Sequence, residues 1–215
     1  MAIAKRKRTP YRPQLWASER MARELGFGVV AGLDEVGMGP LAGPVVAGAV
    51  VLPWHARLPG IKDSKALTAL QRETLDQMIR RRAVGVSVAE VSSEEVDRIG
   101  LTQARRRAML GALEGLAISA EYLLIDAFDL PDAPLPQMAV IKGDATCVSI
   151  MAASIVAKVH RDRQMIEFDL LYPGYGFAQH KGYATRSHRD AVRRLGPSPI
   201  HRLSWAPFRE FVALG

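Results

Sequence analysis

The chain has 215 residues, of which 48% are hydrophobic and 24% are charged, and its formal net charge is +7. This composition excludes global disorder and is sufficient for one large domain with a sizeable core. The single cysteine, Cys147, excludes an internal disulfide and suits a reducing cytoplasm, and no apolar run approaches the ~20 residues that a membrane span needs. The positive charge favours a polyanionic partner such as nucleic acid, although a solvated basic face explains it equally well.

The first half of the chain predicts a basic arm followed by helices and strands. The arm covers residues 1–13 and is expected to be flexible. Thr68 and Gln71 have the spacing of a capping box, which predicts a helix through about Arg81. The other elements expected here are a helix over 14–26, strands over 27–33, 44–52 and 83–91, and a loop over 53–65.

The second half predicts two further strands and three helices. Ser92 or Ser93 caps a helix that Gly100 interrupts, and Pro173 ends the longest helix. The order of elements predicts an α/β fold with one mixed five-stranded sheet flanked by helices. We expect a single domain over 14–215, with a helical C-terminal extension from about residue 172. The elements expected in this half are helices over 101–116, 147–171 and 186–195, strands over 122–125 and 138–141, and a glycine-rich loop over 175–183.

Acidic residues follow three of the predicted strands. Asp34 and Glu35 follow the first strand, Asp126 follows the fourth, and Asp144 follows the fifth. Strand ends meet at one edge of a sheet, so these carboxylates are expected to gather there. Hard divalent cations would relieve their repulsion, and two ions about 4 Å apart could activate water against a phosphodiester. The alternative is that the acids are separate turn and cap residues, which their spacing alone favours.

Asp34 and Glu35 are neighbours, and neighbouring side chains of a regular strand point to opposite faces. They serve one site only if the strand ends or kinks there. Gly37, Gly39 and Pro40 follow at once, which favours such a break.

Five segments of the sequence resemble the type 2 ribonuclease H (ribonuclease HII) family. They occur in the order typical of the family and span most of the chain beyond the arm. The segments are DEVGMGPLAGPVVAGAVVL from Asp34, DSK from Asp63, KGDATCVSIMAASIVAKVHRD from Lys142, YGFAQHKGYAT from Tyr175 and GPSPIHRLSWAP from Gly196.

The resemblance implies a ribonuclease H-like fold, a monomer, and a cytoplasmic endonuclease that uses two divalent ions, Mg²⁺ or Mn²⁺. It implies hydrolysis of the RNA strand of RNA/DNA hybrids and incision of DNA on the 5′ side of embedded ribonucleotides, which leaves 3′-hydroxyl and 5′-phosphate ends. The acids that would bind the metal are Asp34, Glu35, Asp126 and Asp144, with Asp34 bridging both ions. A type 3 relative that prefers long hybrids and a non-catalytic hybrid-binding protein are the alternatives; the former usually carries an extra N-terminal domain.

The resemblance also implies contacts with nucleic acid. The loop of Gly37, Met38 and Gly39 would approach the ribose, and Tyr183 would stack near the ribonucleotide. The candidates for phosphate contact are Lys65, Lys142, Lys181, Lys158, Arg161 and Arg202. Hydrogen-bonding or packing roles, not metal binding, are expected for His180, His188 and His201.

Three residues depart from the family pattern. Met38 stands where the family usually has Arg, and Ala127 and Ala184 stand where it usually has Gly. Each departure changes a loop shape or a contact, but none removes a predicted metal ligand.

Overall fold

The computed structural model of the chain describes residues 13–206 and 208. The predicted basic arm therefore lies outside the described residues, except for Pro13. Within the described part of the chain, no helix is long and apolar enough to cross a membrane.

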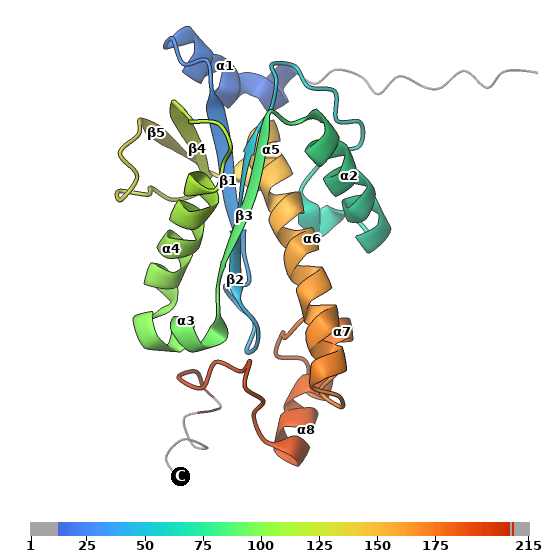
Figure 1. Cartoon of the computed structure of the whole chain (residues 1–215). Helices are drawn as coiled ribbons and strands as arrows, with labels where there is room; N and C mark the ends of the chain where they lie inside the picture. Colours follow the sequence, from blue (N-terminus) through green and yellow to red (C-terminus); the bar gives the residue numbers. More distant parts are fainter. Residues whose placement is uncertain (1–12, 207, 209–215) are drawn as a thin grey trace, which may run out of the picture.

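One mixed sheet forms the centre of the molecule, with the strand order β3-β2-β1-β4-β5 (Figure 1). The first three strands in sequence pair antiparallel, whereas β4 lies parallel to both β1 and β5. This arrangement confirms the predicted mixed five-stranded sheet. The strands are β1 (Val30–Val36), β2 (Val45–Val51), β3 (Gly85–Val91), β4 (Tyr122–Asp126) and β5 (Gln137–Val140).

Helices cover both faces of the sheet. α4 packs on β2 and β3 at one face, and α6 packs on β1 and β2 at the other, with α2 beside it (Figure 1). α7 and α8 follow the far end of α6 as a helical C-terminal extension. The helices are η1 (Pro13–Trp16), α1 (Ala17–Glu24), η2 (Ser64–Ala66), α2 (Ala69–Arg82), α3 (Ser93–Ile99), α4 (Leu101–Glu114), α5 (Gly143–Thr146), α6 (Val148–Leu171), α7 (Phe177–His180) and α8 (Arg186–Leu195).

Local capping signals set several helix ends as the sequence predicted. Thr68 and Gln71 form a complete capping box at the start of α2. The Ser92 hydroxyl accepts a hydrogen bond from the amide of Glu95, which caps α3. Gly100, with φ at +79°, separates α3 from α4. The short helices α5 and α7 lie in segments where the sequence predicted no separate helix.

Two glycines allow α6 to lie unusually close to the sheet. A Cβ built on Gly32 of β1 would lie 2.2 Å from the carbonyl carbon of Ser149, and one on Gly48 of β2 would lie 2.6 Å from the Ala153 oxygen. Neither site has room for a side chain. The helix backbone therefore packs directly on β1, and this brings polar residues of α6 to the acid that follows in the strand.

The first strand differs from the prediction. It begins at Val30, three positions later than expected, and continues through both acids to Val36. The predicted break at Asp34 and Glu35 is therefore wrong. The chain leaves the strand only at Gly37, whose φ of +95° suits glycine.

Candidate active site

Asp34 and Glu35 face opposite sides of the sheet, since both belong to β1. The Asp34 carboxylate is buried beneath α6, where the Ser154 hydroxyl donates a hydrogen bond to it. Its Oδ1 atom also accepts the amide of Glu35 at 2.8 Å. The Glu35 carboxylate faces α4, where the guanidinium of Arg105 lies 3.7 Å away. A layer of helix thus shelters each acid on its own face.

Asp126 and Asp144 complete the group of acids at the end of β4. Leu33 of β1 pairs with Ile125 of β4, so Asp126 lies beside Asp34 where β4 ends. The Oδ1 atom of Asp126 accepts the Gly143 amide at 2.7 Å, which ties the strand end to α5. β4 ends at Asp126, whereas β1 continues to Val36, so the last residues of β1 have no neighbouring strand on this side. Carboxylates on both faces of β1 can therefore reach the space beyond the end of β4.

The carboxylates influence one another electrostatically. Burial raises the pKa of Asp34 well above its usual value, and repulsion from Glu35 and Asp126 raises it further. Burial is also the largest cause of the raised pKa of Glu35, although Arg105 opposes it. The pKa of Asp126 is raised by burial and then by repulsion from Asp144. The acids predicted from strand ends therefore do lie near one another.

Lys65 supplies a positive charge to this group. Its Nζ atom donates to Oδ2 of Asp144 at 2.7 Å, and this bond raises the pKa of the lysine. The lysine side chain is 79% exposed, so it is able to leave the carboxylate.

All donors in the group are carboxylate oxygens, which suit hard divalent cations such as Mg²⁺ and Mn²⁺. Among the described residues, no three acidic, histidine or cysteine side chains are close enough to hold a metal ion in this conformation. An ammonium already neutralises one of the acids, and the others carry raised pKa values. The group thus fits a divalent cation by its chemistry and charge.

A glycine loop lies beside Tyr183 next to this group of acids. Gly37 is buried and Gly39 is exposed, and a Cβ on Gly39 would lie 3.8 Å from Cε1 of the Tyr183 ring. The amide of Leu41 donates to the carbonyl of Gly182 at 2.9 Å, which joins the two loops. Tyr183 is 43% exposed. The loop and the ring therefore form one surface.

A family model described as ribonuclease HII matches residues 31–208. The chain belongs to the ribonuclease HII family. It is an endonuclease that hydrolyses the RNA strand of RNA/DNA hybrids, and incision at embedded ribonucleotides is typical of this family. The ribonuclease HII of Geobacter metallireducens is 50% identical over 199 residues, 93% of each chain. That of Enterococcus faecalis is 46% identical over 98% of this chain and 82% of its own length.

Solved structures of the family share the fold of this chain. Ribonuclease H2 of Pyrococcus horikoshii superposes with a TM-score of 0.74 at 28% identity, over 87% of this chain and 98% of the other. The ribonuclease HII of Archaeoglobus fulgidus, solved in a complex with PCNA, gives a TM-score of 0.72 at 26% identity, over 83% of this chain and 95% of the other. These matches confirm the predicted ribonuclease H-like fold.

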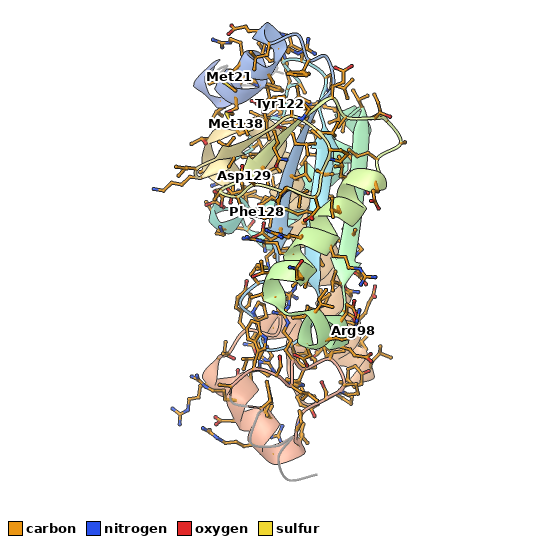
Figure 2. The ribbon with its side chains drawn as sticks, turned by 90° about the vertical axis from the view of Figure 1, so that its left-hand side faces the viewer. Met21, Arg98, Tyr122, Phe128, Asp129 and Met138 are labelled. Carbon is orange, nitrogen blue, oxygen red and sulfur yellow. The ribbon has the colours of Figure 1, made fainter. Side chains whose placement is uncertain are left out.

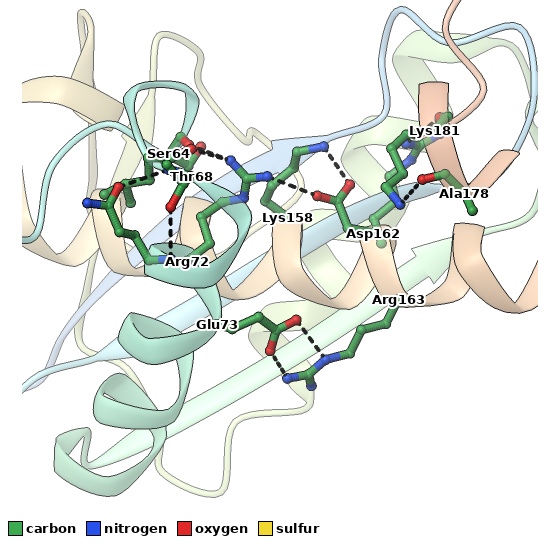
Figure 3. A network of polar contacts seen from close by, with 12 residues as sticks. Ser64, Thr68, Arg72, Glu73, Lys158, Asp162, Arg163, Ala178 and Lys181 are labelled. Carbon is green, nitrogen blue, oxygen red and sulfur yellow. Dashed lines mark hydrogen bonds and ion pairs between the residues drawn. The ribbon is translucent and has the colours of Figure 1, made fainter.

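The lysines that were predicted to contact phosphate differ in their exposure and in the hydrogen bonds of their ammonium groups. Lys142 is exposed on the residue before α5, with φ at +55°. Lys181 instead donates to the carbonyl of Ala178 at 2.6 Å, and Lys158 donates to Asp162 at 2.6 Å (Figure 3). Lys142 is exposed, and Lys65 is exposed although it donates to Asp144, so these two lysines are more accessible to phosphate than the partly buried Lys158 and Lys181.

The three histidines form a network of hydrogen-bonded and stacked rings behind Tyr183. Nδ1–H of His188 donates to the Tyr183 carbonyl at 2.9 Å, so its Nε2 atom accepts the Nε2–H of His201 at 3.0 Å. Nδ1 of His201 accepts the amide of Ser198 at 2.8 Å. Burial lowers the pKa of both His188 and His201 to about 4, which keeps the rings neutral. His180 stacks on His188 with ring centroids 4.2 Å apart. The expected hydrogen-bonding and packing roles are confirmed.

Sequence reasoning missed two residues that contact the acids, Arg105 and Ser154. Arg105 pairs with Glu35 and also stacks over Phe128, 3.9 Å from the ring centre. Ser154 binds Asp34, and its hydroxyl lies 2.9 Å from that of Ser64, one residue before Lys65. Arg105 is one of three consecutive arginines, so its identity carried no signal. Ser154 shows only in three dimensions, through the close approach of α6 to β1.

Proposed function

We propose that the catalytic site of this chain is a group of four carboxylates that hold two divalent ions, Mg²⁺ or Mn²⁺. The carboxylates are those of Asp34, Glu35, Asp126 and Asp144. The observation that carries the proposal is the gathering of these carboxylates at one edge of the sheet, where repulsion between neighbours helps to raise the pKa values of Asp34, Glu35 and Asp126. Such a cluster is stabilised when hard cations bind it. Bound ions would supply Lewis acidity to the attack of water on the phosphodiester.

The chain itself orients the carboxylates before substrate arrives. Main-chain amides hold the Oδ1 atoms of both Asp34 and Asp126, and Ser154 gives Asp34 a second donor. Lys65 balances Asp144, and its exposure suits transfer of the ammonium to a substrate phosphate. No side chain of the protein has to act as nucleophile, and the buried thiol of Cys147, whose pKa is raised by burial, is unsuited to that role.

The surface formed by the loop at Gly37, Met38 and Gly39 with Tyr183 is proposed to recognise the ribonucleotide. An exposed glycine lets main-chain amides approach a sugar closely, and the aromatic ring beside it can stack on the nucleotide. Lys65 and Lys142 are placed for phosphates, while Lys181 would first have to release Ala178. We expect a monomer acting in the cytoplasm on RNA/DNA hybrids and on DNA duplexes that contain ribonucleotides, with incision 5′ to the ribonucleotide and 3′-hydroxyl and 5′-phosphate ends.

The test is incision of an end-labelled DNA duplex with a single embedded ribonucleotide. Cleavage is expected with Mg²⁺ or Mn²⁺ and is expected to stop with a chelator. Mapping the product ends against chemical standards identifies the cut position and the two termini. The rival function, a non-catalytic hybrid-binding protein, predicts tight binding without cleavage in either metal. A cut 3′ to the ribonucleotide, or cleavage that persists in chelator, would contradict the proposal.

A further inference from the structure

Two arginines that were candidates for phosphate contact are fully buried. The exposed fraction of both Arg161, on α6, and Arg202, in the segment after α8, is 0%. Neither pairs with a carboxylate in the part of the chain that the structure describes; each guanidinium instead donates to main-chain carbonyls. The expectation that they contact phosphate is therefore wrong. Burial of a cation without an anion is costly, so these two charges require another explanation.

Arg202 binds the glycine loop from beneath. Its Nη2 atom donates to the carbonyl of Gly37 at 2.6 Å and to that of Gly43 at 2.9 Å. Its Nη1 atom donates to the carbonyl of Met38 at 3.4 Å. One planar guanidinium thus holds the carbonyls of two consecutive loop residues toward the interior of the protein.

Arg161 joins the same loop to the segment that carries Tyr183. Its Nε atom donates to the carbonyl of Pro44 at 3.0 Å, and its Nη2 atom donates to that of Ala42 at 3.0 Å. Its Nη1 atom reaches across to the carbonyl of Lys181, also at 3.0 Å. The two sides of the proposed recognition surface are therefore attached to a single side chain.

The glycines of the loop leave the room that these guanidiniums occupy. A Cβ on Gly37 would lie 2.7 Å from Nε of Arg161, and one on Gly43 would lie 3.1 Å from its Nη2 atom. Both glycines also have positive φ, at +95° and +86°. The loop backbone and the two arginines are thus fitted to one another.

The orientation of these carbonyls fixes the orientation of the amides. In a planar trans peptide, the C=O of one residue and the N–H of the next point in opposite directions. Because the carbonyls of Gly37 and Met38 point inward to Arg202, the N–H groups of Met38 and Gly39 point outward. The buried positive charge also favours an anion or an electron-rich oxygen on the outer side of these peptides.

We propose that Arg161 and Arg202 are positioning residues for ribonucleotide recognition. They turn the peptide groups of residues 37–39 so that the amides of Met38 and Gly39 face the nucleic acid, and they hold this loop against Tyr183. Neither arginine touches the substrate. The inference deepens the proposed function and depends on it, since it assigns the recognition surface its supporting groups.

The test compares duplex binding in a chelator, where no cleavage occurs, by wild type and by Arg202→Lys and Arg161→Lys. Lysine keeps the positive charge but lacks the planar fork that spans several carbonyls. Wild type is expected to prefer a duplex with one ribonucleotide over the same all-DNA duplex, and each variant is expected to lose about tenfold of that preference. Affinity for the all-DNA duplex is expected to stay unchanged. Arg194→Lys is the control, because Arg194 donates to the Gly174 carbonyl in the C-terminal extension, away from the loop.

A folded Arg202→Lys protein that keeps the wild-type preference would overturn the inference, as would an equal loss of affinity for both duplexes.

A second measurement needs no variant. The amide resonances of Met38 and Gly39 in the wild type are expected to shift on addition of the single-ribonucleotide duplex and not of the all-DNA duplex. Identical spectra in the two titrations would also overturn the inference. Failure of the proposed function is distinguishable, because wild type would then not cut the ribonucleotide duplex in Mg²⁺ or Mn²⁺.

Discussion

Ala127 and Ala184 stand where the family usually has glycine. Replacing each of them with glycine is expected to change the free energy of unfolding in opposite directions. Ala127 follows Asp126 with φ at +53°, in the left-handed region that costs an L-residue about 1–2 kcal/mol. Ala184 is not among the described residues with positive φ, so its backbone carries no such cost.

The magnitudes follow from this difference. Ala127→Gly removes the left-handed cost but adds about 0.5–1 kcal/mol of unfolded-state entropy, so a net gain of about 0.5–1 kcal/mol is expected. Ala184→Gly adds only the entropy and should lose about 0.5–1 kcal/mol. For a chain of this length, each kcal/mol corresponds to a change in melting temperature of about 2–4 °C.

Thermal and urea unfolding of the two variants and the wild type checks this prediction. The melting temperature is expected to rise for Ala127→Gly and to fall for Ala184→Gly. The reasoning is refuted if Ala127→Gly also lowers the melting temperature, since unfolded-state entropy would then outweigh the backbone conformation at residue 127, or if Ala184→Gly raises it.

Three further predictions concern recognition and pH. Tyr183→Ala should weaken cleavage at a single ribonucleotide by about 1–3 kcal/mol in activation free energy, and non-specific duplex binding much less; equal losses would indicate a misfolded loop. Met38→Arg should raise affinity for the duplex and steepen the slope of log affinity against log salt by about one phosphate contact. The cut should stay 5′ to the ribonucleotide, because the half-buried Met38 side chain packs on the core and leaves recognition to the main chain. A shifted cut would contradict this prediction. His188 and His201 have pKa values of about 4, below the ordinary 6.5, so their contribution to the free energy of unfolding is complete above pH 6.5 and is lost as the pH falls toward 4. The difference in stability between wild type and His201→Gln should shrink over that range, and a constant difference would show that the rings do not titrate there.

The secondary structure was predictable where its signals are local. The capping box at Thr68, the cap at Ser92 and the stop at Gly100 are each read within a few residues, and these helix ends were predicted correctly. The start of β1 was misplaced because Phe27 and Val29 continue the apolar pattern of the strand. Its continuation through Glu35 depends on α4 and α6, which shelter one acid on each face, and no local pattern reports that.

The candidate site was predictable as a set of acids but not as a set of contacts. Asp34 and Asp126 were correctly expected to lie close together, because β1 and β4 are parallel neighbours and Leu33 pairs with Ile125, one residue before each acid. The supporting groups come from distant parts of the sequence: Arg202 lies 165 positions from Gly37, and Arg161 lies 119 positions from Ala42. An arginine in a basic protein suggests contact with phosphate, and only its burial in three dimensions shows that it binds main-chain carbonyls instead.

The most direct test of the proposed site is the incision rate of Asp34→Asn at saturating metal on the single-ribonucleotide duplex. The substitution preserves the shape of the side chain but removes the charge proposed to bind both ions, so the rate should fall about a hundredfold or more while duplex binding is retained. Asp129→Asn is the matched control, since Figure 2 shows Asp129 beside Phe128 in the loop after β4, where it is exposed, and its rate should equal that of wild type. A folded Asp34→Asn protein that cuts within about tenfold of wild type would contradict the assignment of the catalytic site.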